Sequence, residues 1–204
     1  TNIKLVAQCI RTLSIKGLEY RKFGAKALEI MSTLTLARQV LAASGGIAAI
    51  ASLVKTNLDH DVIHACVTAL CNMALLKSCH KDMIRLGVVN TLRDIMMKGK
   101  PESKKFVSVC LINLSSRPEL RSEIVHDNGL EMLFPYILNT RDEDGLKMAG
   151  RTLFIYTYDE YTRKTLTVKF ETVTATGVGS AMVSGVDALV ALLETGFKGP
   201  VEEA

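Results

Sequence analysis

Several side chains that bind metals or act as nucleophiles lie between positions 60 and 80. They are His60, His64, Cys66, Cys71, Cys79 and His80. Imidazole nitrogens and thiolates are ligands that zinc prefers, and histidines four residues apart lie on one face of a helix. Cys66, however, shares a helical face with Ala69 and Met73, where a buried thiol is an inert apolar group. We therefore interpret these residues as structural and expect neither a metal nor a cofactor.

Other reactive patterns are incomplete. The run from Gly177 to Ser180 resembles a phosphate-binding loop, but it lacks the Gly-Lys-Ser/Thr ending. Asn113 and Ser115 form a glycosylation sequon inside a packing segment of a chain without a secretory leader, so we expect no glycan there. No Ser/His/Asp, Cys/His or paired-carboxylate arrangement can be placed on shared geometry. The sequence therefore predicts a protein that is not an enzyme.

Composition limits the cellular setting. The 204 residues are 48% hydrophobic but 5% aromatic, and the net charge of +4 is too mild to indicate a nucleic acid partner. Five cysteines, an odd number, indicate free thiols in a reducing compartment. The longest uncharged stretch, 39–54, has 16 residues, whereas a membrane span needs about 18 or more. We expect a soluble cytoplasmic protein without a membrane span, and we leave a nuclear location open.

Two rows of short sequence words recur along the chain. The first row places a glycine before an apolar segment, at Gly46, Gly87, Gly129 and Gly185. The second row is AKALEIMS, VTALCNMA, SVCLINLS and GRTLFIYT. Within the second row one column holds Ile30, Asn72, Asn113 and Ile155, at spacings of 42, 41 and 42 residues. A constant period of this size is typical of helical solenoids of the armadillo and HEAT size class.

The order of these words resembles the armadillo repeat family. In that family a glycine separates a short first helix from a second helix, and a third helix carries an alanine, leucine and asparagine pattern. The segments around Asn72 and Asn113 match that pattern, whereas HEAT repeats, the nearest competitor, lack the recurring glycine turns. The resemblance implies an all-α, armadillo-type right-handed superhelical solenoid. Pro135 lies in one second helix and should kink or shorten it.

The repeats predict the organisation of the chain. We expect armadillo repeats over residues 1–160, with a truncated first repeat in which residues 5–13 form a second helix. Residues 161–204 are expected to form a divergent last repeat with an incomplete C-terminal end. Residues 165–180 contain β-branched residues at a period of two, which predicts a β-hairpin or irregular insertion, with a mobile loop as the alternative.

The third helices offer a surface for a partner. Positions eight and four residues before the column share its helical face. Five of these eight positions are Lys or Arg and none is acidic. They are Lys22, Lys26, His64, Thr68, Lys105, Val109, Lys147 and Arg151. A basic concave groove predicts an extended, acidic or phosphorylated partner segment, while the alternative is an ordinary solvated face.

The resemblance also implies roles for the column itself. Family asparagines hydrogen-bond the backbone of an extended peptide, and only Asn72 and Asn113 match them, since Ile30 and Ile155 depart from the pattern. The main hypothesis is a noncatalytic protein-protein interaction scaffold, in a cytoskeletal or ciliary assembly where such repeats are common. The alternatives are a nuclear transport adaptor resembling importin-alpha and an RNA-binding helical repeat protein. Importin-alpha carries tryptophan where this chain has Thr68 and Val109, and RNA binding would need stacking aromatics in the columns.

Overall fold

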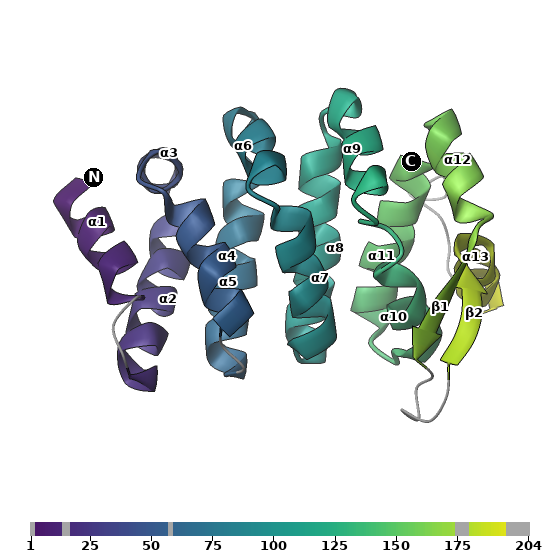
Figure 1. Cartoon of the computed structure of the whole chain (residues 1–204), viewed down its shortest axis with the longest axis horizontal. Helices are drawn as coiled ribbons and strands as arrows, with labels where there is room; N and C mark the ends of the chain where they lie inside the picture. Colours follow the sequence, from purple (N-terminus) through teal and green to yellow (C-terminus); the bar gives the residue numbers. More distant parts are fainter. Residues whose placement is uncertain (1–2, 14–16, 57–58, 174–179, 195–204) are drawn as a thin grey trace.

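Stacked helices make up most of the protein. The computed structural model describes residues 3–13, 17–56, 59–173 and 180–194. Its helices run as successive repeats along one long axis, and a single β-hairpin lies near the C-terminal end (Figure 1). Helix α1 (Ile3–Thr12) packs against α2 at the N-terminal end. The predicted helical solenoid is confirmed.

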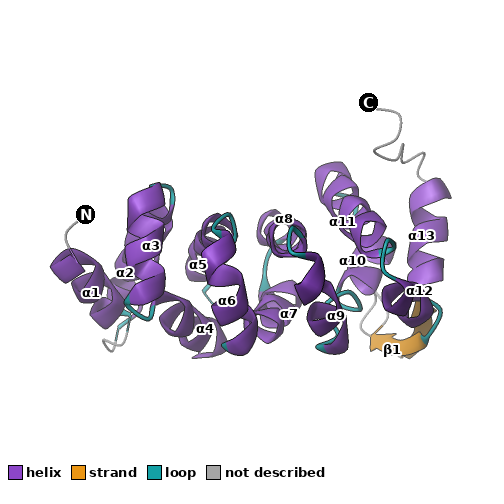
Figure 2. Cartoon of the chain, turned by 90° about the horizontal axis from the view of Figure 1, so that it is seen from above, coloured by secondary structure: helices purple, strands orange, loops and turns teal. Residues whose placement is uncertain are grey.

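The third helices of the repeats stack side by side on one side of the molecule (Figure 2). They are α2 (Leu18–Ser32), α5 (His60–Met73), α8 (Pro101–Ser115) and α11 (Glu143–Tyr156). Two residues before the predicted column, each carries a leucine that is at most 1% exposed: Leu28, Leu70, Leu111 and Leu153. Because burial of one such side chain contributes about 1.5–3 kcal/mol, this row anchors the core.

The second helices are α4 (Gly46–Thr56), α7 (Val88–Lys98), α10 (Leu133–Asn139) and α13 (Gly185–Glu194). The first three form the opposite side of the stack, which faces the viewer in Figure 1, whereas the last lies behind the β-hairpin in that view. Helix α10 has 7 residues where α4 and α7 have 11. Pro135 has no N–H to give the carbonyl four residues earlier, so the helix begins at Leu133. The predicted shortening is therefore present.

The short first helices run along one edge of Figure 1. They are α3 (Thr35–Ala43), α6 (His80–Arg85), α9 (Arg121–His126) and α12 (Glu160–Leu166). A 3₁₀ turn precedes two of them, Lys77–Cys79 before α6 and Pro118–Leu120 before α9. These helices turn the chain from each third helix toward the next second helix.

The turn between first and second helices needs a left-handed residue. Gly45 and Gly87 have φ of +80° and +72°, and Asn128 has φ of +56°. Each lies 15 residues after the column residue of its repeat. Asparagine is a residue that tolerates this conformation well among those with a side chain. Gly129 has a different role, since a Cβ there would lie 2.6 Å from the Ile124 carbonyl oxygen.

The last repeat carries the predicted insertion. Strands β1 (Lys169–Val173) and β2 (Ser180–Ser184) pair antiparallel, so the hairpin prediction is confirmed. Its predicted bounds, 165–180, were wrong, because residues 165–166 belong to a helix and β2 begins only at Ser180. Ser184 and Asp187 then form reciprocal hydrogen bonds, in which the Asp187 carboxylate accepts from the Ser184 N–H at 2.8 Å and the Ser184 hydroxyl accepts from the Asp187 N–H at 3.2 Å. This capping box starts α13 where the other repeats use a left-handed turn.

One basic or imidazole side chain caps the end of each third helix. Eight residues after the column lie Arg38, His80, Arg121 and Arg163, which we call the capping row. Each donates to a carbonyl at the end of the preceding third helix: Arg38 to Thr33 at 3.5 Å, His80 to Ala74 at 2.6 Å, Arg121 to Ser115 at 2.9 Å and Arg163 to Thr157 at 2.7 Å. These carbonyls have no partner within their own helix, and the negative end of the helix dipole favours a cation there.

No single helix in the described part of the chain is long and apolar enough to cross a membrane. Two bent pairs, Thr35–Ala43 with Gly46–Thr56 and His60–Met73 with Lys77–Arg85, reach the required length and composition only when their members are combined across bends of 76° and 106°.

The two glycine roles predict different mutant costs. Gly129→Ala should lower the free energy of unfolding by about 1–3 kcal/mol, because the new methyl group must displace the Ile124 backbone. Gly45→Asn should cost less than about 1 kcal/mol, because no atom lies within 4 Å of a Cβ there and Asn128 already fills the equivalent position. Urea unfolding of both variants measures the difference. Equal costs would show that close packing does not distinguish the two sites.

His80 makes stability depend on pH. The side chain is fully buried, and burial lowers the pKa of its imidazole. The folded protein therefore holds His80 neutral while the unfolded chain takes up a proton below about pH 6.5, so this part of the stability is present above that pH and lost as the pH falls. His80→Gln should flatten the fall in unfolding free energy between pH 7.5 and 5.5. An unchanged pH dependence in the variant would assign the effect to other groups.

Candidate functional site

The histidines and cysteines considered as metal ligands are separated by the fold. His60 is exposed at the start of α5, and His64 shares a 3.2 Å hydrogen bond between its Nδ1 and the Ser103 hydroxyl. Cys66, Cys71 and Cys79 are buried as free thiols. Burial raises the pKa of Cys66 to about 12, so this thiol stays protonated at neutral pH.

The described residues contain no group of three or more His, Cys, Asp or Glu side chains that could hold a metal ion. The glycine-rich run predicted to resemble a phosphate loop, 177–180, lies almost wholly outside the described residues. The remaining candidate surface is the exposed side of α2, α5, α8 and α11, which we call the third-helix face.

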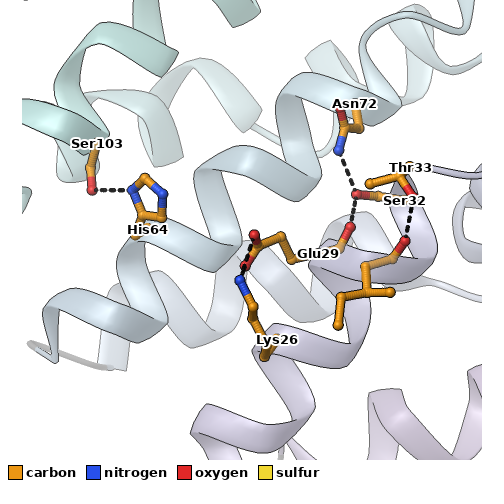
Figure 3. A network of polar contacts seen from close by, with 8 residues as sticks. Lys26, Glu29, Ser32, Thr33, His64, Asn72 and Ser103 are labelled. Carbon is orange, nitrogen blue, oxygen red and sulfur yellow. Dashed lines mark hydrogen bonds and ion pairs between the residues drawn. The ribbon is translucent and has the colours of Figure 1, made fainter.

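The two lysines of α2 on this face are neutralised by neighbours. Lys22 Nζ lies 3.1 Å from Asp59 and 3.3 Å from Asp61, both at the start of α5. Lys26 Nζ lies 2.8 Å from Glu29 on its own helix (Figure 3). The hydrogen bonds that Lys22 donates to the two aspartates raise the pKa of its ammonium group. Burial would raise the pKa of Asp59, but the Val62 N–H and Lys22 together lower it.

The same position on α5 also makes a contact between repeats. His64 reaches Ser103 at the start of α8 (Figure 3). Its ring also packs edge-on against Phe106, with ring centroids 5.5 Å apart. Lys22 and His64, both eight residues before the column, therefore tie α2 to α5 and α5 to α8. Four residues later, Thr68 and Val109 are both half-buried.

The predicted cations of α8 and α11, unlike those of α2, are not paired with acids among the residues that the structure describes. Lys105 is half-buried, and Lys147 and Arg151 are exposed. In the described part of the chain these three side chains make no ion pair or hydrogen bond. Asp142 and Asp144 follow Lys105 by 37 and 39 residues, the same offsets that separate Asp59 and Asp61 from Lys22.

The two asparagines of the column face the preceding repeat. Asn72 Nδ2 donates to the Ser32 hydroxyl at 2.9 Å, and Asn113 Nδ2 donates to the Cys71 carbonyl at 3.3 Å (Figure 3 shows the first). Each amide therefore links two third helices through its nitrogen. Within the described residues, the amide oxygens accept no hydrogen bond, which leaves them as acceptors on the third-helix face.

A row of acids on this face was missed by the sequence reasoning. Eleven residues before the column, in the first turn of each third helix, lie Glu19, Asp61, Glu102 and Asp144, all exposed. Reading the column three residues further upstream would have found this acidic row. Acids in a first helical turn complement the positive end of the helix dipole. The third-helix face is therefore not uniformly basic, because acids line one side of the predicted cations.

A second exposed row follows the third helices. Three residues after the column lie Thr33, Leu75, Ser116 and Tyr158, all exposed. Tyr158 is 68% exposed and packs edge-on against Phe154, with ring centroids 5.4 Å apart. The face thus presents an acidic row, the predicted basic positions and an end row that is partly apolar.

The fold closely matches solved repeat structures. One engineered protein superposes with a TM-score of 0.70 at 18% identity, with 78% of this chain and 66% of that chain covered. The chain thus spans slightly less than two thirds of that engineered protein. A designed armadillo repeat protein in complex with the peptide (KR)4 superposes with a TM-score of 0.65 at 16% identity, covering 78% of this chain and 77% of that one.

A computationally designed armadillo repeat protein for modular peptide recognition covers 92% of this chain and 81% of its own, with a TM-score of 0.68 at 16% identity. The fold is armadillo-like. No family model and no curated protein matches the sequence. The armadillo-like fold accounts for the three helices of each repeat.

The link between Asn72 and Ser32 predicts a measurable coupling. Asn72→Ala should lower the free energy of unfolding by about 1 kcal/mol, because the fully buried Ser32 hydroxyl loses a donor. The double variant with Ser32→Ala should lose less than the sum of the two single variants, by about 0.5–1.5 kcal/mol. Denaturant unfolding of the four proteins measures this coupling. Additive losses would show that the two side chains stabilise the stack independently.

Proposed function

We propose that this chain is a noncatalytic protein-protein interaction scaffold whose third-helix face binds an extended, acidic segment of another protein. The single observation that carries the proposal is the unpaired state of Lys105, Lys147 and Arg151 within the described residues. Unpaired cations on neighbouring helices attract acids at long range and make association fast and sensitive to salt.

The acidic row restricts where such a segment would lie. Glu19, Asp61, Glu102 and Asp144 repel an acidic chain from the N-terminal ends of the third helices. The segment would instead lie toward the middle and the C-terminal ends of these helices. There the free amide oxygens of Asn72 and Asn113 are placed to accept from its backbone N–H groups.

Designed proteins of this fold support a peptide as the partner. One is solved in complex with the peptide (KR)4 and another was designed for modular peptide recognition. The charges of the face lead us to propose an acidic rather than a basic segment for this chain. A cytoplasmic setting, in a cytoskeletal or ciliary assembly, is part of the same proposal.

Peptides of opposite charge test this function directly. We expect a labelled twelve-residue peptide of alternating glutamate and glycine to bind in fluorescence polarisation, with affinity falling as salt rises from 50 to 300 mM. The matched lysine-glycine peptide and a single-stranded RNA of equal length should bind at least about tenfold more weakly. Tighter binding of the lysine peptide would support a transport-adaptor role, and tighter binding of RNA would support the RNA-binding alternative. Either result would overturn the proposal.

A further inference from the structure

Among the described residues, some cations of the third-helix face form ion pairs within the protein, and others do not. Lys22 is held by Asp59 and Asp61, and Lys26 is held by Glu29. An acidic partner would have to compete with these carboxylates, so the net attraction at α2 is small. Lys105 has Asp142 and Asp144 at the offsets that neutralise Lys22. Lys147 and Arg151 of α11 have no aspartates at these offsets, and Asp144, three residues before Lys147, forms no ion pair with it.

Helix α11 presents two kinds of side chain along one stripe. Lys147, Arg151 and Phe154 follow the spacing i, i+4 and i+7, which places them on one helical face. Tyr158 lies two residues beyond the end of α11, and its ring packs against Phe154. Lys147 and Arg151 are exposed, and Tyr158 is 68% exposed beside the half-buried Phe154 ring. The stripe therefore begins with positive charge and ends with an aromatic pair of which only the Tyr158 ring is exposed.

The equivalent stripes of the other third helices lack this combination. On α5 the corresponding residues are His64, Thr68, Cys71 and Leu75, and on α8 they are Lys105, Val109, Ile112 and Ser116. On α2 they are Lys22, Lys26, Glu29 and Thr33. At these equivalent positions, among the four described third helices, only the α11 stripe joins two cations to two aromatic rings, whereas the exposed Tyr20 and Phe23 of α2 lie at other positions.

The length of the stripe limits the partner. From Lys147 to Phe154 the helix rises about 10 Å, at 1.5 Å per residue. An extended chain covers that distance with about three residues, at roughly 3.3 Å each. A side chain that pairs with Lys147 and one that packs on the aromatic pair of Phe154 and Tyr158 would therefore lie about three to five residues apart in the partner.

We propose that α11 is the main anchoring site of the third-helix face, and that it binds an acidic segment with a large apolar side chain three to five residues from its acidic group. This inference rests on the proposed function and specifies which chemical groups the partner segment carries. Charge complementarity selects the acids, and the exposed Tyr158 ring offers the apolar contact that purely acidic segments cannot use.

Two double charge reversals form a matched pair of variants. Lys147→Glu with Arg151→Glu alters the unpaired cations, and Lys22→Glu with Lys26→Glu alters the paired ones. The ligand is a glutamate-glycine peptide with one phenylalanine four residues after its last glutamate. We expect the α11 reversal to weaken binding about tenfold or more, and the α2 reversal to weaken it less than about threefold. The corresponding glutamine pairs repeat the comparison if a reversal unfolds the protein.

Tyr158 provides the second arm of the test. Tyr158→Ala should weaken binding of the phenylalanine peptide about fivefold and leave a serine-substituted peptide unchanged, while Tyr158→Phe should bind both like the wild type. Equal weakening by the two charge pairs, or an equal effect of Tyr158→Ala on both peptides, would overturn the assignment to α11 while the scaffold function stands. Failure of the wild type to bind either acidic peptide would overturn both proposals.

Discussion

The last carbonyls of each third helix need hydrogen-bond donors, and every repeat meets this constraint with the same position of its next first helix. Arg38, Arg121 and Arg163 use guanidinium groups, and His80 uses a neutral imidazole. Because the donor belongs to the following helix, the bond also fixes the angle at which the chain turns. The turn from each third helix into the following first helix therefore sets the positions of the left-handed turn, the second helix and the next third helix.

Contacts between neighbouring third helices then hold successive repeats together along the stack. Near the N-terminal ends, Lys22 and His64 reach forward to the next repeat. Near the C-terminal ends, Asn72 and Asn113 reach back to the preceding one. Helix α11 continues the pattern through buried Tyr156, whose hydroxyl donates to the Leu111 carbonyl at 3.3 Å. A solenoid has few contacts beyond neighbouring repeats, so its stability is nearly a sum of such local terms.

Because most contacts lie within a repeat or between neighbouring repeats, the sequence could predict some features and not others. The period of 42 residues, the third helices, the shortened α10 and the β-hairpin all follow from spacing, proline chemistry and β-branched alternation. The roles of Lys22 and the asparagines depend on the rotation of each third helix relative to its neighbours, which a column alone does not define. The acidic row lies eleven residues before the column of Asn72 and Asn113, and the capping row lies eight residues after it. Both rows can be read from the sequence, but the family pattern does not include these positions.

The β-hairpin lies between the first and second helices of the last repeat, yet those helices keep the neighbours expected of them. Helix α12 packs on α9, and α13 packs on α10. The Ser184 and Asp187 capping box restarts the helix locally, without the left-handed residue of the other repeats. The connection between the first and second helices thus accommodates an inserted segment. Chain length added there changes the outline of the protein, while α13, the one helix described after it, still packs on α10.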